Sequence, residues 1–143
     1  MHDTSTGCAP LLAFTNPAGL YDASANGYSH VAAVAPGARL VFVAGQGGEN
    51  GKGELPADFR LQVRQAMDNL RTALAAAGAG PGDVAKLTVL VVGHDEERLH
   101  VFGAELERAF GSGAKPACTL IPVPRLALDG MLFEIEATAV LPA

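Results

Sequence analysis

The segment from Val84 to Val92 constrains the fold more than any other part of the chain. Its residues are almost all β-branched or leucine, and only Lys86 and Thr88 are polar. A run of this kind is typical of a strand that is buried on both faces of a sheet. The sequence therefore predicts a central strand here, and both of its sides must be covered.

Two helices are predicted, one before and one after this strand. Residues 57–77 carry apolar side chains at steps of three and four, which make one stripe along a helix, and Gly78 favours the helix end. Residues 95–110 carry a second stripe, with Asp95 as N-cap and two glutamates in the first turn, where the helix dipole favours them. The stripes consist of Phe59, Val63, Met67, Leu70 and Leu74, and of Leu99, Phe102, Leu106, Ala109 and Phe110.

The remaining segments predicted to be extended are residues 28–35, 39–44, 116–128 and 131–141. The first two are interpreted as a hairpin, because Pro36-Gly37 between them is a turn signal. Pro122 and Pro124 lack N–H donors on one edge of their strand, so that segment ends or borders the sheet there. Hairpins pair strands antiparallel and helical crossovers pair them parallel, which gives a mixed sheet in an α+β fold.

This set of elements leaves one face of the sheet without cover. Two helices can cover only one face, yet the strands at residues 39–44 and 84–92 are apolar on both faces. We expect copies of the same chain to bury the second face. The sequence therefore predicts an obligate oligomer.

Length, charge and cysteine content narrow the class of protein. A chain of 143 residues makes one domain, which we place at residues 27–143, after a turn-rich N-terminal arm of low regularity at residues 1–26. The net charge is −5 and the basic residues are scattered, which disfavours a nucleic-acid or anionic membrane partner. Two cysteines, Cys8 and Cys118, make no disulfide framework, and Cys118 is predicted to be a reduced thiol. With no recognisable signal peptide and no apolar run of about 18 residues, the cytoplasm is the default location.

Several familiar motifs fail when they are compared with the sequence. The glycine-rich loop at residues 45–53 has neither the Walker spacing nor the dinucleotide fingerprint, so we interpret it as a connection between a strand and a helix. The four histidines lack metal-ligand spacing, and no serine stands in a nucleophile elbow. We therefore expect neither a phosphate-binding loop nor a metal site. Gly45 itself is a candidate for close approach of the backbone to a ligand.

The last strand carries the clearest chemical signal. Glu134 and Glu136 lie on one face, because side chains alternate along a strand. Two carboxylates on one face of a core strand can hold or activate a water molecule, and a solvated outer face is the alternative interpretation. Cys118 also has two interpretations, a buried small apolar residue or a reactive thiol, and Arg125 is its candidate neighbouring cation.

Several stretches match one set of family signatures in order and spacing, from about Gly27 to the end of the chain. They are Gly27-Tyr28-Ser29-His30, Val41–Gln46, Gln62–Ala77, Val84–Val89 and Phe133–Ala139. Together they resemble the Rid (YjgF-type) family, whose best-known members are imine and enamine deaminases. The resemblance implies a chorismate-mutase-like fold and a homotrimer with an interior β-barrel and small-molecule clefts between its subunits.

The same resemblance implies a hydrolase that needs no cofactor and converts reactive imines or enamines to ketoacids and ammonia. Carried over by motif, Tyr28 lines the cleft, Gly45 is the close-approach glycine and Glu134 positions the water. The family deaminases hold the substrate carboxylate with an arginine, in Pro-Ala-Arg, where this chain has Cys118. A helix asparagine of the cleft is also replaced, at about Gly103.

The missing arginine predicts an altered substrate. A charge-assisted hydrogen bond to a carboxylate is worth about 1.5–3 kcal/mol, so we expect weak or absent activity on 2-imino acids. Arg125 is the alternative carboxylate-binding residue. A non-catalytic trimer that binds a small molecule or a protein partner is the alternative function. Ribonuclease activity, which some family names carry, is disfavoured by the acidic charge balance.

Overall fold

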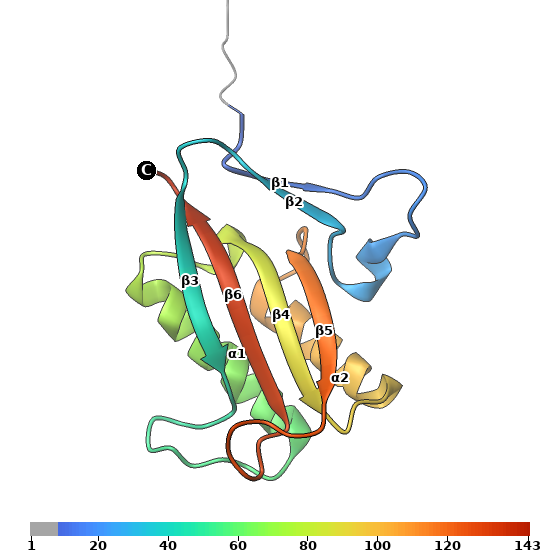
Figure 1. Ribbon diagram of the computed structural model, residues 1–143, viewed down its shortest axis with the longest axis vertical. Coiled ribbons are helices and arrows are strands. Elements are labelled where there is room, and N and C mark those ends of the chain that lie inside the picture. Colours follow the sequence, from blue (N-terminus) through green and yellow to red (C-terminus); the bar gives the residue numbers. More distant parts are fainter. Residues whose placement is uncertain (1–8) are drawn as a thin grey trace, which may run out of the picture.

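The computed structural model describes residues 9–143, so Cys8 and the first part of the N-terminal arm lie outside the described residues. A four-stranded sheet carries two long helices on one face, as Figure 1 shows. The strands are β1 (Leu12–Thr15), β2 (Val31–Val34), β3 (Arg39–Gln46), β4 (Val84–Val92), β5 (Ala117–Val123) and β6 (Phe133–Leu141). The helices are α1 (Phe59–Ala76) and α2 (Glu96–Phe110), with short 3₁₀ turns η1 (Ala23–Asn26) and η2 (Pro81–Asp83).

The order of strands in the main sheet is β3-β6-β4-β5. Strands β4 and β5 are parallel, and β6 pairs antiparallel with both β3 and β4. The predicted α+β fold, with a mixed sheet and two helices on one face, is therefore confirmed. Strand β4 has the predicted bounds, and β5 is the edge strand that its prolines favour.

The helices begin at the residues whose side chains can cap them. The Asp58 carboxylate accepts a hydrogen bond of 2.9 Å from the Leu61 amide at the start of α1, and Asp95 accepts one of 2.8 Å from Arg98 at the start of α2. Each bond satisfies an amide that the first helical turn leaves free. The predicted N-cap at Asp95 is confirmed.

The hydrophobic core lies between the helices and the sheet. The Phe133 ring of β6 packs against Phe59 and Phe102, with ring centroids 6.1 and 5.8 Å apart. Phe133, Ile135 and Ala137 are buried on this side, while Glu134 is half-buried and Glu136 exposed on the other. The predicted alternation along the last strand is therefore confirmed.

The other face of the sheet is left open in one chain. Phe42 of β3 is 76% exposed and Leu40 is 48% exposed, although both are large apolar residues in a regular strand. Contiguous apolar surface of this kind on a protein marks an interaction site. The structure thus has the uncovered face that the count of helices predicts.

The hairpin predicted for residues 28–35 and 39–44 is wrong. Strand β2 pairs with β1 in a separate two-stranded sheet, and β3 pairs with β6. Ser29 explains the difference, because its amide donates to the Pro116 carbonyl and its hydroxyl to the Lys115 carbonyl, at 3.2 and 2.7 Å. These bonds start β2 beside β5, at the sheet edge opposite β3, so the chain crosses the end of the sheet before β3 begins (Figure 1).

The arm that the sequence predicts to have low regularity contains β1 and η1. The turn signals around β1 did not indicate this strand of four residues, Leu-Ala-Phe-Thr. It pairs with β2, and that pairing could not be inferred from the local sequence. The division into an arm at residues 1–26 and a domain at residues 27–143 stays a prediction.

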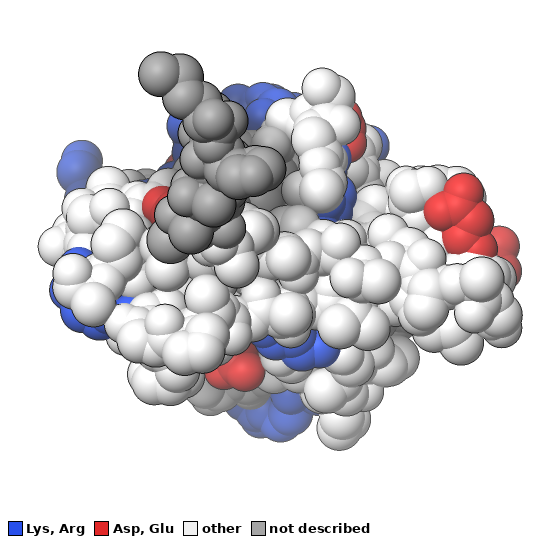
Figure 2. Space-filling view, turned by 90° about the horizontal axis from the view of Figure 1, so that it is seen from above, with Lys and Arg blue, Asp and Glu red and all other residues white. Residues whose placement is uncertain are grey.

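Charged residues make up only 17% of the chain. The end of the molecule seen in Figure 2 is mostly uncharged, and the basic side chains visible there do not form one continuous patch. No helix among the described residues is long and apolar enough to cross a membrane.

A buried carboxylate joins the two helices. Glu105 of α2 is 2% exposed and accepts hydrogen bonds from Arg64 at 2.9 and 3.2 Å, from Arg60 at 3.3 Å and from Arg108 at 3.4 Å. These bonds, that from Arg64 above all, hold the pKa of Glu105 below its usual value of 4.5, against the opposing effect of burial. The cluster therefore stabilises the helix pair in the ionised form of the carboxylate.

Replacing Glu105 with glutamine is expected to lower the free energy of unfolding at pH 7 by about 1–3 kcal/mol, because charged hydrogen bonds are lost. The folded-state pKa lies below the unfolded one, so this stabilisation is present above pH 4.5 and is lost as the pH falls through the folded value. Denaturant titrations from pH 7 to pH 3 should show the two proteins converging. Parallel curves would contradict the assignment.

Candidate functional site

Tyr28 and Cys118 lie in one pocket at the β5 edge of the sheet, which we call the aromatic pocket. Its volume is about 390 Å³. It is lined by Tyr21, Asn26, Gly27, Tyr28, Leu99, Phe102, Cys118, Thr119 and Leu120. The structure thus brings together two of the predicted site residues, which are far apart in the sequence.

A short capped turn positions Tyr28. Asp22 accepts hydrogen bonds from the Ser24 amide and hydroxyl, at 3.0 and 2.6 Å, and so begins η1. Gly27 ends the turn with a φ of 77°, a left-handed conformation that favours glycine. The bonds of Ser29 to residues 115 and 116 then hold the next residues against the start of β5. The Gly-Tyr-Ser signature therefore forms a turn, an aromatic wall and an anchor, in that order.

The Cys118 thiol is a neutral group. Burial raises its pKa to about 11, and the positive charge of Lys86 opposes this only in part. At neutral pH the thiol is therefore protonated, which favours the interpretation as a small apolar residue, here half-buried, over a reactive thiolate. Arg125 lines neither this pocket nor the next one, and its guanidinium binds the Asp129 carboxylate at 2.9 Å.

Gly45 and Glu134 lie in a second pocket, which we call the carboxylate pocket. It has a volume of about 210 Å³ and lies on the open face of the sheet, lined by Gly45, Thr88, Leu90, Glu134 and Glu136. The β3–β6 register shifts between Val43 and Gln46, so Gly45 stands in a bulge beside β6. A Cβ atom at Gly45 would lie 2.0 Å from Glu134 Oε1. The carboxylate therefore rests in space that only glycine leaves free.

Replacing Gly45 with alanine is expected to move the Glu134 carboxylate and to lower any turnover about tenfold or more, because small misplacements of a reacting group are costly. The fold should persist, since the added methyl meets the flexible end of a side chain. Kinetics and a melting curve of the variant test this. Gly51→Ala is the matched control, because nothing lies within 4 Å of its added Cβ. Unchanged turnover in Gly45→Ala would contradict the placement.

Within one chain the two pockets stay apart. They share no lining residue, and the aromatic pocket lies at the β5 edge, while Gly45 lies on β3 at the opposite edge. One chain thus brings Tyr28 to Cys118 and Glu134 to Gly45, but it does not bring these two pairs together.

Sequence reasoning missed Tyr21 as a pocket residue. Its ring meets the Tyr28 and His30 rings edge-on, with centroids 6.4 and 5.1 Å apart. The signal was an aromatic residue shortly before the Gly27-Tyr28 signature. Leu99 and Phe102 were expected in the apolar stripe of α2, and the edge of that stripe lines the pocket.

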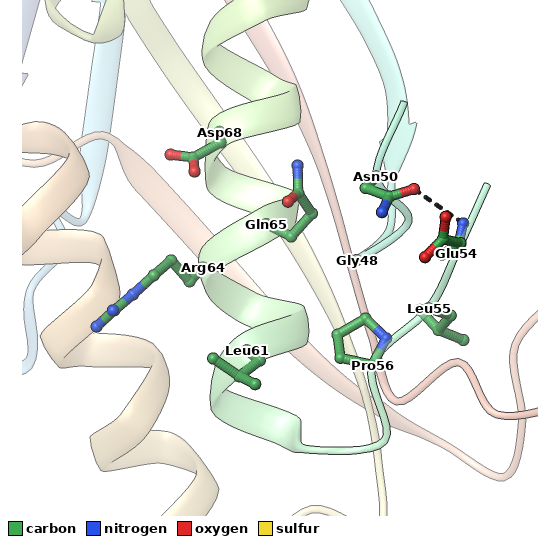
Figure 3. Close-up of a pocket in the computed structure, with 9 residues that line it drawn as sticks. All are labelled: Gly48, Asn50, Glu54, Leu55, Pro56, Leu61, Arg64, Gln65 and Asp68. Atoms are coloured by element: carbon green, nitrogen blue, oxygen red, sulfur yellow. Dashed lines mark hydrogen bonds between the residues drawn. The ribbon is translucent and has the colours of Figure 1, made fainter. Parts of the chain in front are cut away.

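A third pocket, of about 400 Å³, lies between α1 and the loop that follows β3 (Figure 3). None of the predicted site residues lines this pocket, although Gly48 and Asn50 of the glycine-rich loop do. Asn50 Oδ1 accepts from the Lys52 and Glu54 amides, at 2.9 and 3.0 Å, and the Asn50 carbonyl accepts from Gly53. Loop amides that a phosphate would need are thus bonded within the loop, which agrees with its interpretation as a connection.

Comparison with known proteins places these features in a family. The family model described as Endoribonuclease L-PSP matches residues 21–141. The chain is 38% identical to the 2-iminobutanoate/2-iminopropanoate deaminase of Escherichia coli K12 over 104 residues, which are 71% of this chain and 79% of that protein.

Two solved structures are similar over most of the chain. YyfB of Yersinia pestis, described as a protein of the conserved Rid family, is 34% identical with a TM-score of 0.87, and the match covers 92% of this chain and all of that one. The YjgF gene product of E. coli is 34% identical with a TM-score of 0.63, covering 78% and 92%. On these matches of sequence and fold, the chain belongs to the Rid family.

Proposed function

We propose that this chain is a homotrimeric hydrolase of reactive imine or enamine metabolites, with its active sites between subunits. One observation carries the proposal: the site residues expected from the family fall into two separate pockets of one chain. Tyr28 and Cys118 line one pocket, and Gly45 and Glu134 line the other. The aromatic pocket of one subunit and the carboxylate pocket of the next would together make one complete site.

The open face of the sheet supports the oligomer. Phe42 and Leu40 are exposed on β3, and Ile121 of β5 is 42% exposed. Apolar surface of this kind is stabilised when copies of the chain cover it. Three open faces that pack around an axis would enclose the interior β-barrel that the family resemblance implies, with the pockets meeting along the seams.

The proposed reaction is the addition of water to a C=N bond. The water oxygen bonds to the imine carbon, the C–N bond breaks, and the products are a carbonyl compound and ammonia. In this proposal Glu134 holds the water, accepts its proton and returns that proton to the nitrogen, which leaves as ammonia. Tyr28 donates a hydrogen bond to the group that develops charge. No step needs an oxidant, a metal or a cofactor.

The substrate differs from that of the family's 2-imino acid deaminases. Among the described residues, no lysine or arginine lines the aromatic pocket. The neutral thiol of Cys118 stands where a carboxylate-binding arginine is expected. We infer a substrate without an obligatory carboxylate. Arg125 as an alternative carboxylate-binding residue stays a prediction for the assembled oligomer.

Ammonia release from freshly generated imines tests the activity. The wild-type protein should exceed the spontaneous rate for at least one imine, and Glu134→Gln should lower that rate. Glu96→Gln, an exposed glutamate in the first turn of α2, is the control and should behave as wild type. If the wild type never exceeds the spontaneous rate but still binds small ligands, the protein is the non-catalytic binding module instead.

Mixed oligomers test whether each site uses two chains. Glu134→Gln and Tyr28→Ala should each be inactive alone, and their co-expression should restore part of the activity. Restoration follows because some sites then combine an intact Glu134 from one chain with an intact Tyr28 from another. If co-expression restores nothing, the two pockets do not serve a shared site.

A further inference from the structure

The aromatic pocket has an uncharged lining. None of its nine lining residues is an aspartate, glutamate, lysine, arginine or histidine. Its walls are formed by rings and branched aliphatic side chains, from Tyr21, Tyr28, Leu99, Phe102 and Leu120. Burial holds the Cys118 thiol in its neutral form. A ligand in this pocket therefore meets apolar surface and a few neutral polar groups, and no described residue of the lining carries a charge.

The rings are held in place before any ligand arrives. Tyr21, Tyr28 and His30 contact one another edge-on, and the Tyr28 and His30 centroids are 5.5 Å apart. His30 Nε2 lies 2.8 Å from the Tyr21 carbonyl oxygen, and the Asn16 side chain accepts a bond of 2.9 Å from the His30 amide. Tyr21 is nonetheless 61% exposed. Within residues 9–143, its ring is thus a fixed aromatic surface that stays largely exposed.

The size of the pocket suits a ring. Phe102, which is 5% exposed, forms the inner wall, and Tyr21 forms the outer one. Apolar cavities of about 150 Å³ in proteins bind benzene, and this pocket of about 390 Å³ has room for a ring and a reacting group. A short 2-imino acid would leave much of this apolar surface wet.

We propose that the aromatic pocket selects imines of aromatic, uncharged carbonyl compounds, and that Tyr21 is a specificity-determining residue that stacks on the substrate ring. This inference rests on the proposed function, and it names the substrate class of the same site. An aromatic ring gains edge or face contacts with Tyr21 and Tyr28. A carboxylate would lose water without gaining a cation from the described residues that line the pocket, which opposes its binding.

Lys86 supports an alternative, in which the pocket prefers anionic ring compounds. Its ammonium donates a hydrogen bond of 2.7 Å to Thr119 Oγ1, and Thr119 lines the pocket. A carboxylate that reached this end of the pocket would meet a positive charge. This alternative predicts that anionic ring compounds bind better than neutral ones.

Binding of one neutral and one anionic ring compound distinguishes the proposal from this alternative. Calorimetry with 2-phenylacetamide and phenylpyruvate should show the neutral amide binding at least tenfold more tightly. Tyr21→Ala should weaken binding of the amide about two- to tenfold, which corresponds to the worth of one aromatic pair. Leu20→Ala, an exposed neighbour outside the pocket, is the control and should bind as wild type. Equal or tighter binding of phenylpyruvate, or an unchanged Tyr21→Ala, would overturn the proposal.

A turnover comparison separates this inference from the proposed function. Amine oxidase acting on 2-phenylethylamine and amino-acid oxidase acting on phenylalanine supply imines that differ only by the carboxylate. Faster hydrolysis of the first imine by the wild type supports both proposals. Faster hydrolysis of the second overturns the substrate class and leaves the hydrolase standing. Tighter amide binding without turnover of either imine supports the ligand class and overturns the hydrolase.

Discussion

Replacing Cys118 with arginine is expected to raise the rate of 2-iminopropanoate hydrolysis by about ten- to a hundredfold, the equivalent of one charged hydrogen bond to a carboxylate. Cys118 lines the aromatic pocket, so an arginine there would project its guanidinium toward the substrate. The fork geometry of that group matches a carboxylate with two parallel bonds. Ammonia release from freshly generated 2-aminoacrylate, which gives this imine, is the measurement.

Two variants at the same position separate charge from size. Cys118→Lys adds charge without the fork and should gain less than Cys118→Arg, whereas Cys118→Met adds length without charge and should gain nothing. A gain in Cys118→Met equal to that in Cys118→Arg would mean that shape, not charge, limits the native site. No gain in any correctly folded variant would contradict the assignment of this position to substrate binding.

Replacing Gln62 with leucine is expected to lower the free energy of unfolding by about 2–4 kcal/mol, because three part-buried hydrogen bonds of its side chain would be lost. Gln62 is fully buried in α1. Its side-chain amide donates to the Pro56 and Gly130 carbonyls, at 2.7 and 2.9 Å, and accepts from the Leu132 amide at 2.9 Å. One side chain thus ties both loops at this end of the sheet to the helix.

Denaturant titration at a fixed protein concentration checks this loss, since an oligomer's stability depends on concentration. Gln65→Leu is the matched control, because Gln65 is half-buried one turn later and its side chain, among the described residues, bonds only to Asn69. It should change stability by less than about 1 kcal/mol. A Gln62→Leu protein as stable as the control would show that the loops do not depend on this side chain.

The elements that the sequence predicted best are those with a strong period and a clear end. Strand β4 is apolar throughout, and α2 has both a stripe and a capping aspartate, so local residues suffice to define them. The pairing of β2 was predicted wrongly, because it depends on hydrogen bonds from Ser29 to the start of β5, far along the chain. Proximity in the sequence favoured a hairpin, but the bonds of Ser29 to residues 115 and 116 place β2 at the other edge of the sheet.

The candidate site shows the same division. The residue types at Tyr28, Gly45 and Glu134 were identified from motifs, but their grouping into two pockets was not. The contact of Glu134 with Gly45 depends on a bulge between β3 and β6, which no spacing in the sequence indicates. Nor does the sequence reveal the burial of Gln62, since glutamine in an amphipathic helix is ordinarily a surface residue.

The fold and the site both depend on other copies of the chain, which we propose cover the open face of the sheet and complete the pockets. Sedimentation at micromolar concentration tests this most directly. We predict a single species of three times the 14.6 kDa of one chain. A folded single chain as the stable species would contradict this prediction. Phe42 would then stay exposed to water, and Glu134 and Tyr28 would remain in separate pockets.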